Sequence, residues 1–318
     1  MSFPGFLSTW RRGVTRPLLA VVAAAALAAC GGGTSQIEAF VAERVVAFGD
    51  ETSVLTSDGR KYAVNALKDD GSLDCAAQAI WVQAVASIYG FVFAECNPLN
   101  VASPQAVMRA QAGARVADLA TQVDTQLAAG GVGGRTLVTV MAGANDVLDL
   151  YALYPDTDRS ALLAQARARG TALAAQVNRL VGAGARVVVS TVIDLGLTPY
   201  ALAEKAAHTD TDRAALLSAL TTEFNAGLRT AVLNDGRFVG LVLADEMVQA
   251  LVRAPSAFGL GNVTAAACNA ALPDCSRNTL VSGADPATWL WADDLRLAFN
   301  AQNRLGILAV NRARNNPF

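Results

Sequence analysis

Arg44-Val-Val-Ala-Phe-Gly-Asp50 is an apolar run that ends in Gly-Asp, which is typical of a buried strand leading into a functional turn. Runs of the same character occupy residues 135–143, 185–193 and 238–244. Alanine-rich stretches with helical spacing lie between and after them, at about residues 105–128, 158–182, 212–233 and 298–313. Strands that alternate with helices predict a three-layer α/β/α fold with a central parallel sheet.

In such sheets ligands bind beyond the carboxyl ends of the strands. Gly49-Asp50-Glu51 and Gly143-Ala144-Asn145-Asp146 follow two of the predicted strands directly. We therefore expect the functional site at these two turns. The segment 254–288 is expected to be an irregular excursion before the last helix.

The composition favours one large globular domain and argues against a nucleic-acid partner. The chain has 318 residues, of which 53% are hydrophobic and 16% are charged, so it can bury a large core. The formal charge is -2, and the first 29 residues contain arginines but no acidic residue. The remaining body is therefore more acidic still and has no basic stripe for phosphates.

The first thirty residues carry a targeting signal. Arg11 and Arg12 precede an apolar run that ends in Leu27-Ala28-Ala29-Cys30, which resembles a bacterial lipobox. We expect residues 1–29 to be a lipoprotein signal peptide, residues 30–40 a lipidated Cys30 with a flexible tether, and residues 41–318 a single domain. An ordinary signal peptide is the alternative.

Acylated Cys30 would make the lipid bilayer a partner of this chain and place it in the bacterial cell envelope. Gly31 after Cys30 resembles the outer-membrane pattern, so we expect an anchor in that membrane, with the domain facing the periplasm or the surface. The other four cysteines, an even number, fit an oxidising compartment. We expect the local pairs Cys75–Cys96 and Cys268–Cys275, with metal binding as the alternative.

Four short blocks, taken together and in this order, resemble those of the GDSL/SGNH hydrolases. They are Phe48-Gly49-Asp50, Gly113 within Ala112-Gly-Ala-Arg115, Gly143-Ala144-Asn145-Asp146, and Trp291-Ala-Asp293-Asp-Leu-Arg296. Gly196-Leu-Thr-Pro199 and Thr222-Glu-Phe-Asn225 further resemble secreted esterases and phospholipases of that family. The resemblance implies an SGNH-hydrolase, flavodoxin-like fold and activity on ester bonds.

The same resemblance assigns roles to single residues. It places the nucleophilic serine at Glu51 and the general-base histidine at Arg296, so both positions are substituted. Gly113 and Asn145 match the donors of the oxyanion hole, and Asp293 matches the acid that orients the base. Arginine is ionised at every working pH and cannot act as the base, so an efficient serine esterase is excluded.

The two substitutions are complementary in charge. We expect Glu51 and Arg296 to form an ion pair, and the Glu51 carboxylate to accept hydrogen bonds from Gly113 and Asn145. The alternative is that both side chains turn to solvent.

Other residues of the sequence could replace the missing serine and histidine. Ser53 is an alternative nucleophile, although a serine that caps a turn or helix is the more common case. His208, the only histidine, is expected to be an exposed residue at the start of a helix. Asp146, Asp149, Asp293 and Asp294 could indicate a metal, but carboxylates near strand ends also cap helices, so we expect neither a metal nor a cofactor.

Three interpretations follow. The first is a catalytically impaired family member, a pseudoenzyme, that retains a pocket for an ester, acyl-lipid or glycan ligand. The second is an active esterase or lipase that works through a rearranged site with Ser53, Glu51 or Asp293. The third is a structural envelope protein whose pocket is plugged by side chains.

Overall fold

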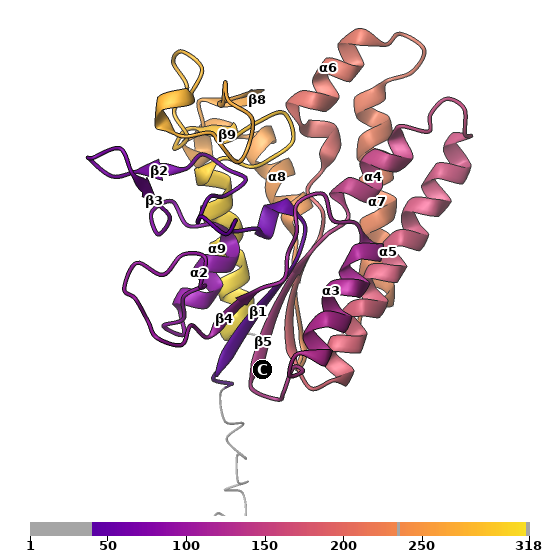
Figure 1. Cartoon of the computed structure of the whole chain (residues 1–318). Coiled ribbons are helices and arrows are strands. Elements are labelled where there is room, and N and C mark those ends of the chain that lie inside the picture. Colours follow the sequence, from indigo (N-terminus) through magenta and orange to yellow (C-terminus); the bar gives the residue numbers. More distant parts are fainter. Residues whose placement is uncertain (1–39, 234–235, 316–318) are drawn as a thin grey trace, which may run out of the picture. The chain divides into compact units, whose positions relative to one another are not determined.

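The computed structural model places the apolar strands in one parallel sheet. The strands are β1 (Arg44–Gly49), β4 (Ala106–Met108), β5 (Thr136–Met141), β6 (Arg186–Ser190) and β7 (Val239–Val242). Their order is β4-β1-β5-β6-β7, which is the flavodoxin-like order (Figure 1). The structure describes residues 40–233 and 236–315; Cys30, the signal peptide and the tether before residue 40 lie outside them and stay predictions.

Helices cover both faces of this sheet, so the predicted three-layer α/β/α fold is confirmed (Figure 1). One face carries α2 (Trp81–Ser87), α8 (Ala244–Arg253) and α9 (Phe299–Asn315). The other face carries α3 (Val116–Ala128), α4 (Ala144–Tyr151), α5 (Arg159–Gly182) and α7 (Arg213–Ala231). Helix α6 (Pro199–Ala207) lies at the upper end of the view.

Two glycines let α5 and α7 pack closely. A Cβ atom at Gly170 would lie 1.9 Å from the carbonyl oxygen of Phe224, and one at Gly227 would lie 2.1 Å from that of Arg167. Because any side chain at either position would overlap the other helix's backbone, the close approach depends on both glycines. This helix pair supports the loops that follow β5 and β6.

The predicted helix over 105–128 is wrong in its first half. Ala106–Met108 is the edge strand β4, in which Val107 pairs with Val46 of β1. Helix α3 begins only at Val116, because Gly113 has φ +75°, a conformation that no α-helix contains. Pairing with a neighbouring strand therefore overrides the helical propensity of a short alanine-containing stretch.

The other predicted elements lie where they were expected, and the late excursion is mostly irregular. It contains the short strands β8 (Asn262–Ala266) and β9 (Trp289–Trp291), which pair in parallel, and the 3-10 helices η3 (Pro255–Phe258) and η4 (Arg277–Thr279). A second small sheet pairs β2 (Ala66–Leu67) with β3 (Leu73–Asp74). Both predicted disulfides, Cys75–Cys96 and Cys268–Cys275, are present.

The main core of the described chain extends from Ala42 to Ala313. The part of the chain that begins at Phe40 therefore has a hydrophobic core of its own, and we expect it to fold without the first thirty residues. No helix within 40–233 and 236–315 is long and apolar enough to cross a bilayer.

The strand order also fixes where a site can form. From β1 the chain crosses to β4 on one side and then returns to β5 on the other side of β1. The loops after β1 and β5 therefore leave the sheet in different directions, which opens a crevice at the carboxyl ends of these two strands.

Candidate active site

Glu51 lies directly beyond the end of β1, in the 3-10 helix η1 (Glu51–Ser53). Gly49 makes this turn with φ +131°, and a Cβ atom there would lie 1.9 Å from the carbonyl oxygen of Met141. The buried side chain of Gln122 secures the turn, because it accepts from the Gly49 amide and donates to the Gly49 carbonyl, both at 2.9 Å. These contacts hold the Glu51 carboxylate at the crevice.

Gly113 and Asn145 meet at one oxygen of the Glu51 carboxylate. The Gly113 amide donates to Oε2 at 2.8 Å, and Asn145 Nδ2 donates to the same oxygen at 3.1 Å. Asn145 Nδ2 also donates to the Ala114 carbonyl at 3.1 Å, which fixes its orientation. Two donors that converge on one anionic oxygen have the arrangement of an oxyanion hole, but the anion belongs to the protein itself.

Arg296 binds the other oxygen of this carboxylate. Its Nη2 lies 2.7 Å from Glu51 Oε1, so the ion pair expected from the sequence is present. Its Nη1 lies 3.1 Å from Asp293 Oδ2. Asp293 Oδ1 in turn accepts from the amides of Leu295 and Arg296, at 2.9 and 2.6 Å. Asp293 therefore orients an arginine where the resemblance implies a histidine.

The charges of this cluster stabilise one another. Burial alone would raise the pKa of Glu51, but the hydrogen bond and positive charge of Arg296 hold that pKa below its usual value. Burial acts to lower the pKa of Arg296, while Asp293 and Glu51 together hold it above its usual value. The pair is therefore ionised at neutral pH.

Asp50, the neighbour of Glu51, behaves in the opposite way. Its side chain is buried and accepts one hydrogen bond from the Thr52 amide at 3.0 Å. Burial and the adjacent Glu51 charge raise the pKa of Asp50 to about 8. Asp50 is therefore mainly protonated at neutral pH, and the site holds one ionised and one neutral carboxyl group side by side.

Side chains fill most of the crevice. The hollow beside Glu51 and Arg296 has a volume of only about 20 Å³, which is room for about one water molecule. A wider cleft of about 450 Å³ shares Arg296 with this hollow, and Asp293, Tyr62 and Asn269 also line it. Space for a ligand thus exists next to the ion pair rather than at Glu51.

Ser53 is not placed to replace the missing nucleophile. Its side chain is fully buried, does not line the crevice, and accepts a hydrogen bond from Trp81 Nε1 at 3.2 Å. Neither is it a cap, because Asp50 caps η1 and Ser53 is its last residue. The serine instead binds α2 to the turn after β1.

His208 lies away from the residues that line the crevice. It is exposed, as expected, but it ends α6 rather than starting a helix; Asp212 caps the following helix, α7. Its Nε2 lies 3.5 Å from Glu204 Oε2, one turn earlier in α6. The polar stretch around His208 is therefore the connection between these two helices.

Asp293 binds Arg296, and two more of the candidate metal ligands, Asp146 and Asp149, have partners as well. Asp146 Oδ2 accepts from the Val116 amide at 2.9 Å and so caps α3 from a neighbouring element. Asp149 pairs with Arg115. Within 40–233 and 236–315, no cluster of three or more histidine, cysteine or acidic side chains is placed to hold a metal ion.

Gln122 and Phe224 shape the site without having been singled out. The Phe224 ring packs against Gly143, where a Cβ atom would lie 2.1 Å from Cζ of the ring. Phe224 belongs to the stretch Thr222–Asn225 that resembles secreted esterases, so the sequence held a signal for it. Gln122 is one polar residue in a helical pattern, and nothing in the sequence distinguishes it.

One family profile matches this chain, and solved structures show a weak similarity to it. The profile of the family described as GDSL-like lipase/acylhydrolase matches residues 45–274. Among solved structures, the chain is similar to the Bacillus subtilis protein YxiM, with 12% identity and a TM-score of 0.37, over 87% of this chain and 57% of that one. It is also similar to a variant of an acetyl xylan esterase from Geobacillus stearothermophilus, with 13% identity and a TM-score of 0.38, over 86% and 96% of the two chains.

No curated protein matches the chain. The family profile covers well over half of the chain, from the start of β1 to the loop of the second disulfide. The chain therefore belongs to the GDSL-like lipase/acylhydrolase family, and its fold is that of the SGNH hydrolases.

Proposed function

We propose that this chain is a catalytically silent member of its family, whose oxyanion hole is occupied by the protein's own Glu51 carboxylate. The observation that carries the proposal is that Gly113 and Asn145 both donate to Glu51 Oε2 while Arg296 binds Oε1. An ester carbonyl would have to displace this carboxylate before it could reach either donor. The protein would then lose the hydrogen bonds of a buried charge.

The proton chemistry supports the same conclusion. Arg296 cannot accept a proton, so no group at its position would activate a hydroxyl or a water molecule. Attack by Glu51 itself would form a mixed anhydride, and its depressed pKa makes this carboxylate a weak nucleophile. Ser53, the alternative nucleophile, faces Trp81 instead of the crevice.

We further propose that the family's ligand pocket survives as the cleft of about 450 Å³ beside Arg296. Its volume falls within the usual range for small-molecule sites, and Asp293, Asn269 and Tyr62 give it polar groups. An ester, acyl-lipid or glycan that once was a substrate would bind there without being cleaved. The sequence up to Cys30 supports a lipid-anchored protein of the cell envelope, and the two disulfides fit an oxidising compartment.

The test is hydrolysis of p-nitrophenyl acetate by a soluble form that begins at Gly31. Four proteins are compared: the parent, Glu51→Ser, Arg296→His, and the double variant. We expect no activity above buffer from the parent and the single variants, because a nucleophile and its base act as a unit. The double variant should hydrolyse the ester at least about 10²-fold faster than the parent and the single variants, because this is the usual contribution of a general base.

Adding Asn145→Ala to the double variant provides the control. If the gained activity depends on the oxyanion hole, this third change should lower the rate of the double variant about 10²- to 10³-fold. Turnover by the parent that Ser53→Ala abolishes would overturn the proposal, because the nucleophile would then have moved. Parent activity that survives Ser53→Ala but not Glu51→Gln would overturn it as well.

A further inference from the structure

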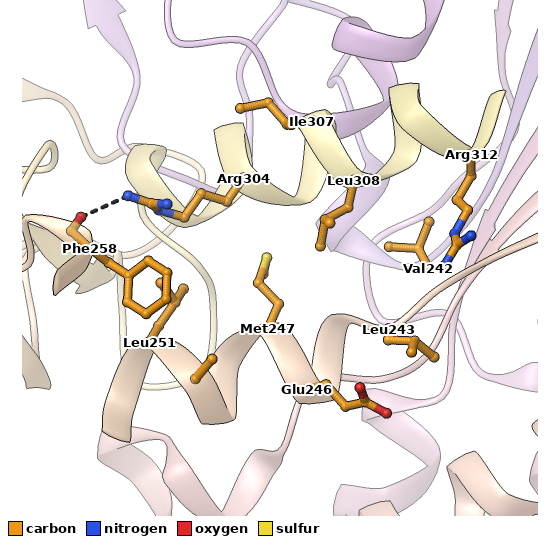
Figure 2. Close-up of a pocket in the computed structure, with 11 residues that line it drawn as sticks. Val242, Leu243, Glu246, Met247, Leu251, Phe258, Arg304, Ile307, Leu308 and Arg312 are labelled. Carbon is orange, nitrogen blue, oxygen red and sulfur yellow. Dashed lines mark hydrogen bonds between the residues drawn. The ribbon is translucent and has the colours of Figure 1, made fainter. Parts of the chain in front are cut away.

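A third hollow lies between α8 and α9, and Glu51 does not line it. It is a groove of about 460 Å³ whose lining residues include none of those around the Glu51 crevice. Figure 2 shows Met247 of α8 and Leu308 of α9 facing each other across it, with Arg304 and Arg312 toward its two ends. The groove is therefore independent of the family's site.

The groove is apolar and partly open to solvent. Leu251 and Val242 form part of its buried floor, at 1% exposure each. On α9, by contrast, Ile307 is 52% exposed and Leu308 is 37% exposed. Neighbouring large apolar side chains exposed beside a hollow of ligand size mark a binding surface more often than a random surface position does.

The charges at the groove are not balanced. Glu246 is the acidic residue of the lining, and Arg229 outside the groove pairs with it at 3.2 Å. Arg304 donates to two neutral acceptors, the Phe258 carbonyl and Asn300 Oδ1, each at 2.7 Å. Arg312 has no ion pair within residues 40–233 and 236–315. Among the described residues, the two guanidinium groups at this apolar groove thus form no ion pair with a carboxylate.

We propose that this groove binds a free single-chain anionic amphiphile, an alkyl chain that ends in a carboxylate. The chain would cover the apolar surface between Met247 and Leu308, and the carboxylate would pair with Arg312. A guanidinium group suits this role because it forms strong, paired hydrogen bonds with a carboxylate. Burial of the alkyl chain would supply most of the affinity, and the ion pair would select the anion.

The test is isothermal titration calorimetry of the soluble form from Gly31, with dodecanoate below its micellar concentration as the probe. The comparison ligand is dodecyltrimethylammonium, which has the same chain with the opposite charge. We expect saturable binding of one dodecanoate per chain and at least about tenfold weaker binding of the cation, since a like-charged head group would face Arg304 and Arg312. Equal affinity for the two ligands would overturn the proposal.

Three variants locate the site. Arg312→Ala should weaken dodecanoate binding about tenfold, the contribution of one hydrogen-bonded charge pair. Leu308→Asp should abolish binding, because it places a carboxylate against the alkyl chain. Arg314→Ala is the matched control, since Arg314 lies on the same helix but does not line the groove, and its affinity should equal that of the parent.

Vesicles of phosphatidylglycerol separate a free ligand from a membrane. If Arg312→Ala and Leu308→Asp reduce binding to these vesicles while dodecanoate never saturates the parent, the groove is a bilayer contact and the proposal is wrong. Loss of dodecanoate binding in Arg314→Ala to the same extent as in Arg312→Ala would contradict it too. Neither result depends on whether the Glu51 site is active.

Discussion

The Glu51 crevice and the groove between α8 and α9 differ in how their charged side chains are paired and in how much space is open. At Glu51 the carboxylate has three donors around it, and only about 20 Å³ is left beside them. At the groove, about 460 Å³ is open and Arg312 has no ion pair within the part of the chain that the structure describes. The Glu51 carboxylate is thus neutralised by the chain itself, whereas the groove combines open space with a guanidinium group that has no ion pair among the described residues.

This difference shows why retained motif residues do not by themselves indicate activity. Gly113 and Asn145 keep the geometry of oxyanion donors, yet both are already bonded to Glu51. A donor contributes to catalysis only if it binds the transition state better than its ground-state partner. Here the ground-state partner is a buried charge on the same chain, so a substrate would have to compete with that charge for both donors.

The largest expected effect follows from breaking the internal ion pair. Arg296→Met keeps much of the side-chain volume but leaves the buried Glu51 carboxylate without its cation, next to Asp50 and Asp293. We expect the free energy of unfolding to fall by about 3 to 5 kcal/mol, as for other buried pairs that lose one partner. Urea denaturation at pH 7 would measure this change.

Arg167→Met is the matched control for that measurement. Arg167 also bonds a carboxylate, that of Glu223 at 2.7 Å, but its side chain is 51% exposed. Its loss should cost about 1 kcal/mol or less. Adding Glu51→Gln to Arg296→Met should recover part of the stability, because no uncompensated charge remains. If Arg296→Met and Arg167→Met lower the free energy of unfolding equally, water screens the Glu51 carboxylate and the ion pair in the crevice is not a buried one.

An effect that is smaller per pH unit comes from the neutral carboxyl group of Asp50. Its pKa rises from 3.8 to about 8 on folding, so between these values the folded chain keeps a proton that the unfolded chain releases. The free energy of unfolding therefore falls as pH rises from about 4 to about 8, by at most about 1.4 kcal/mol per pH unit. Asp50→Asn should remove this slope while keeping an acceptor for the Thr52 amide.

The measurement is the difference in urea stability between Asp50→Asn and the parent from pH 5 to pH 9. We expect the advantage of the variant to grow up to about pH 8 and then to stay constant. Glu51 acts in the opposite direction, because its lowered pKa adds stability above its ordinary value of 4.5 that is lost as pH falls through the folded-state pKa. A difference that does not change with pH would mean that Asp50 is already ionised in the folded chain.

The sequence predicts the sheet and the paired substitutions well, because both leave strong local signals. The runs at 44–49 and 136–141 are mostly apolar and each ends at or close to a glycine, so β1 and β5 were recognisable. Glu51 and Arg296 stand at motif positions, and their opposite charges indicated a pair that the structure contains. The two disulfides followed from short separations along the chain.

What could not be predicted depends on packing between distant parts of the chain. Strand β4 has only three residues, and it exists because it pairs with β1 rather than because of its own propensity. Ser53 stands two residues beyond the nucleophile position, and only the contact with Trp81 shows that it faces away from the crevice. The α8–α9 groove joins two helices that the irregular segment 254–288 separates along the chain, and no motif marks it.

The smallest expected effect concerns an exposed side chain at the groove. Ile307→Gln replaces an apolar side chain that is 52% exposed, so the free energy of unfolding should change by no more than about 0.5 kcal/mol. Leu305→Ala, two residues earlier on α9 but fully buried, should cost about 2 to 5 kcal/mol in the same urea titration. If Ile307→Gln proves as costly as Leu305→Ala, Ile307 is packed in solution and the groove is not open. The contrast with the filled Glu51 crevice would then fail, because both hollows would be closed by the protein itself.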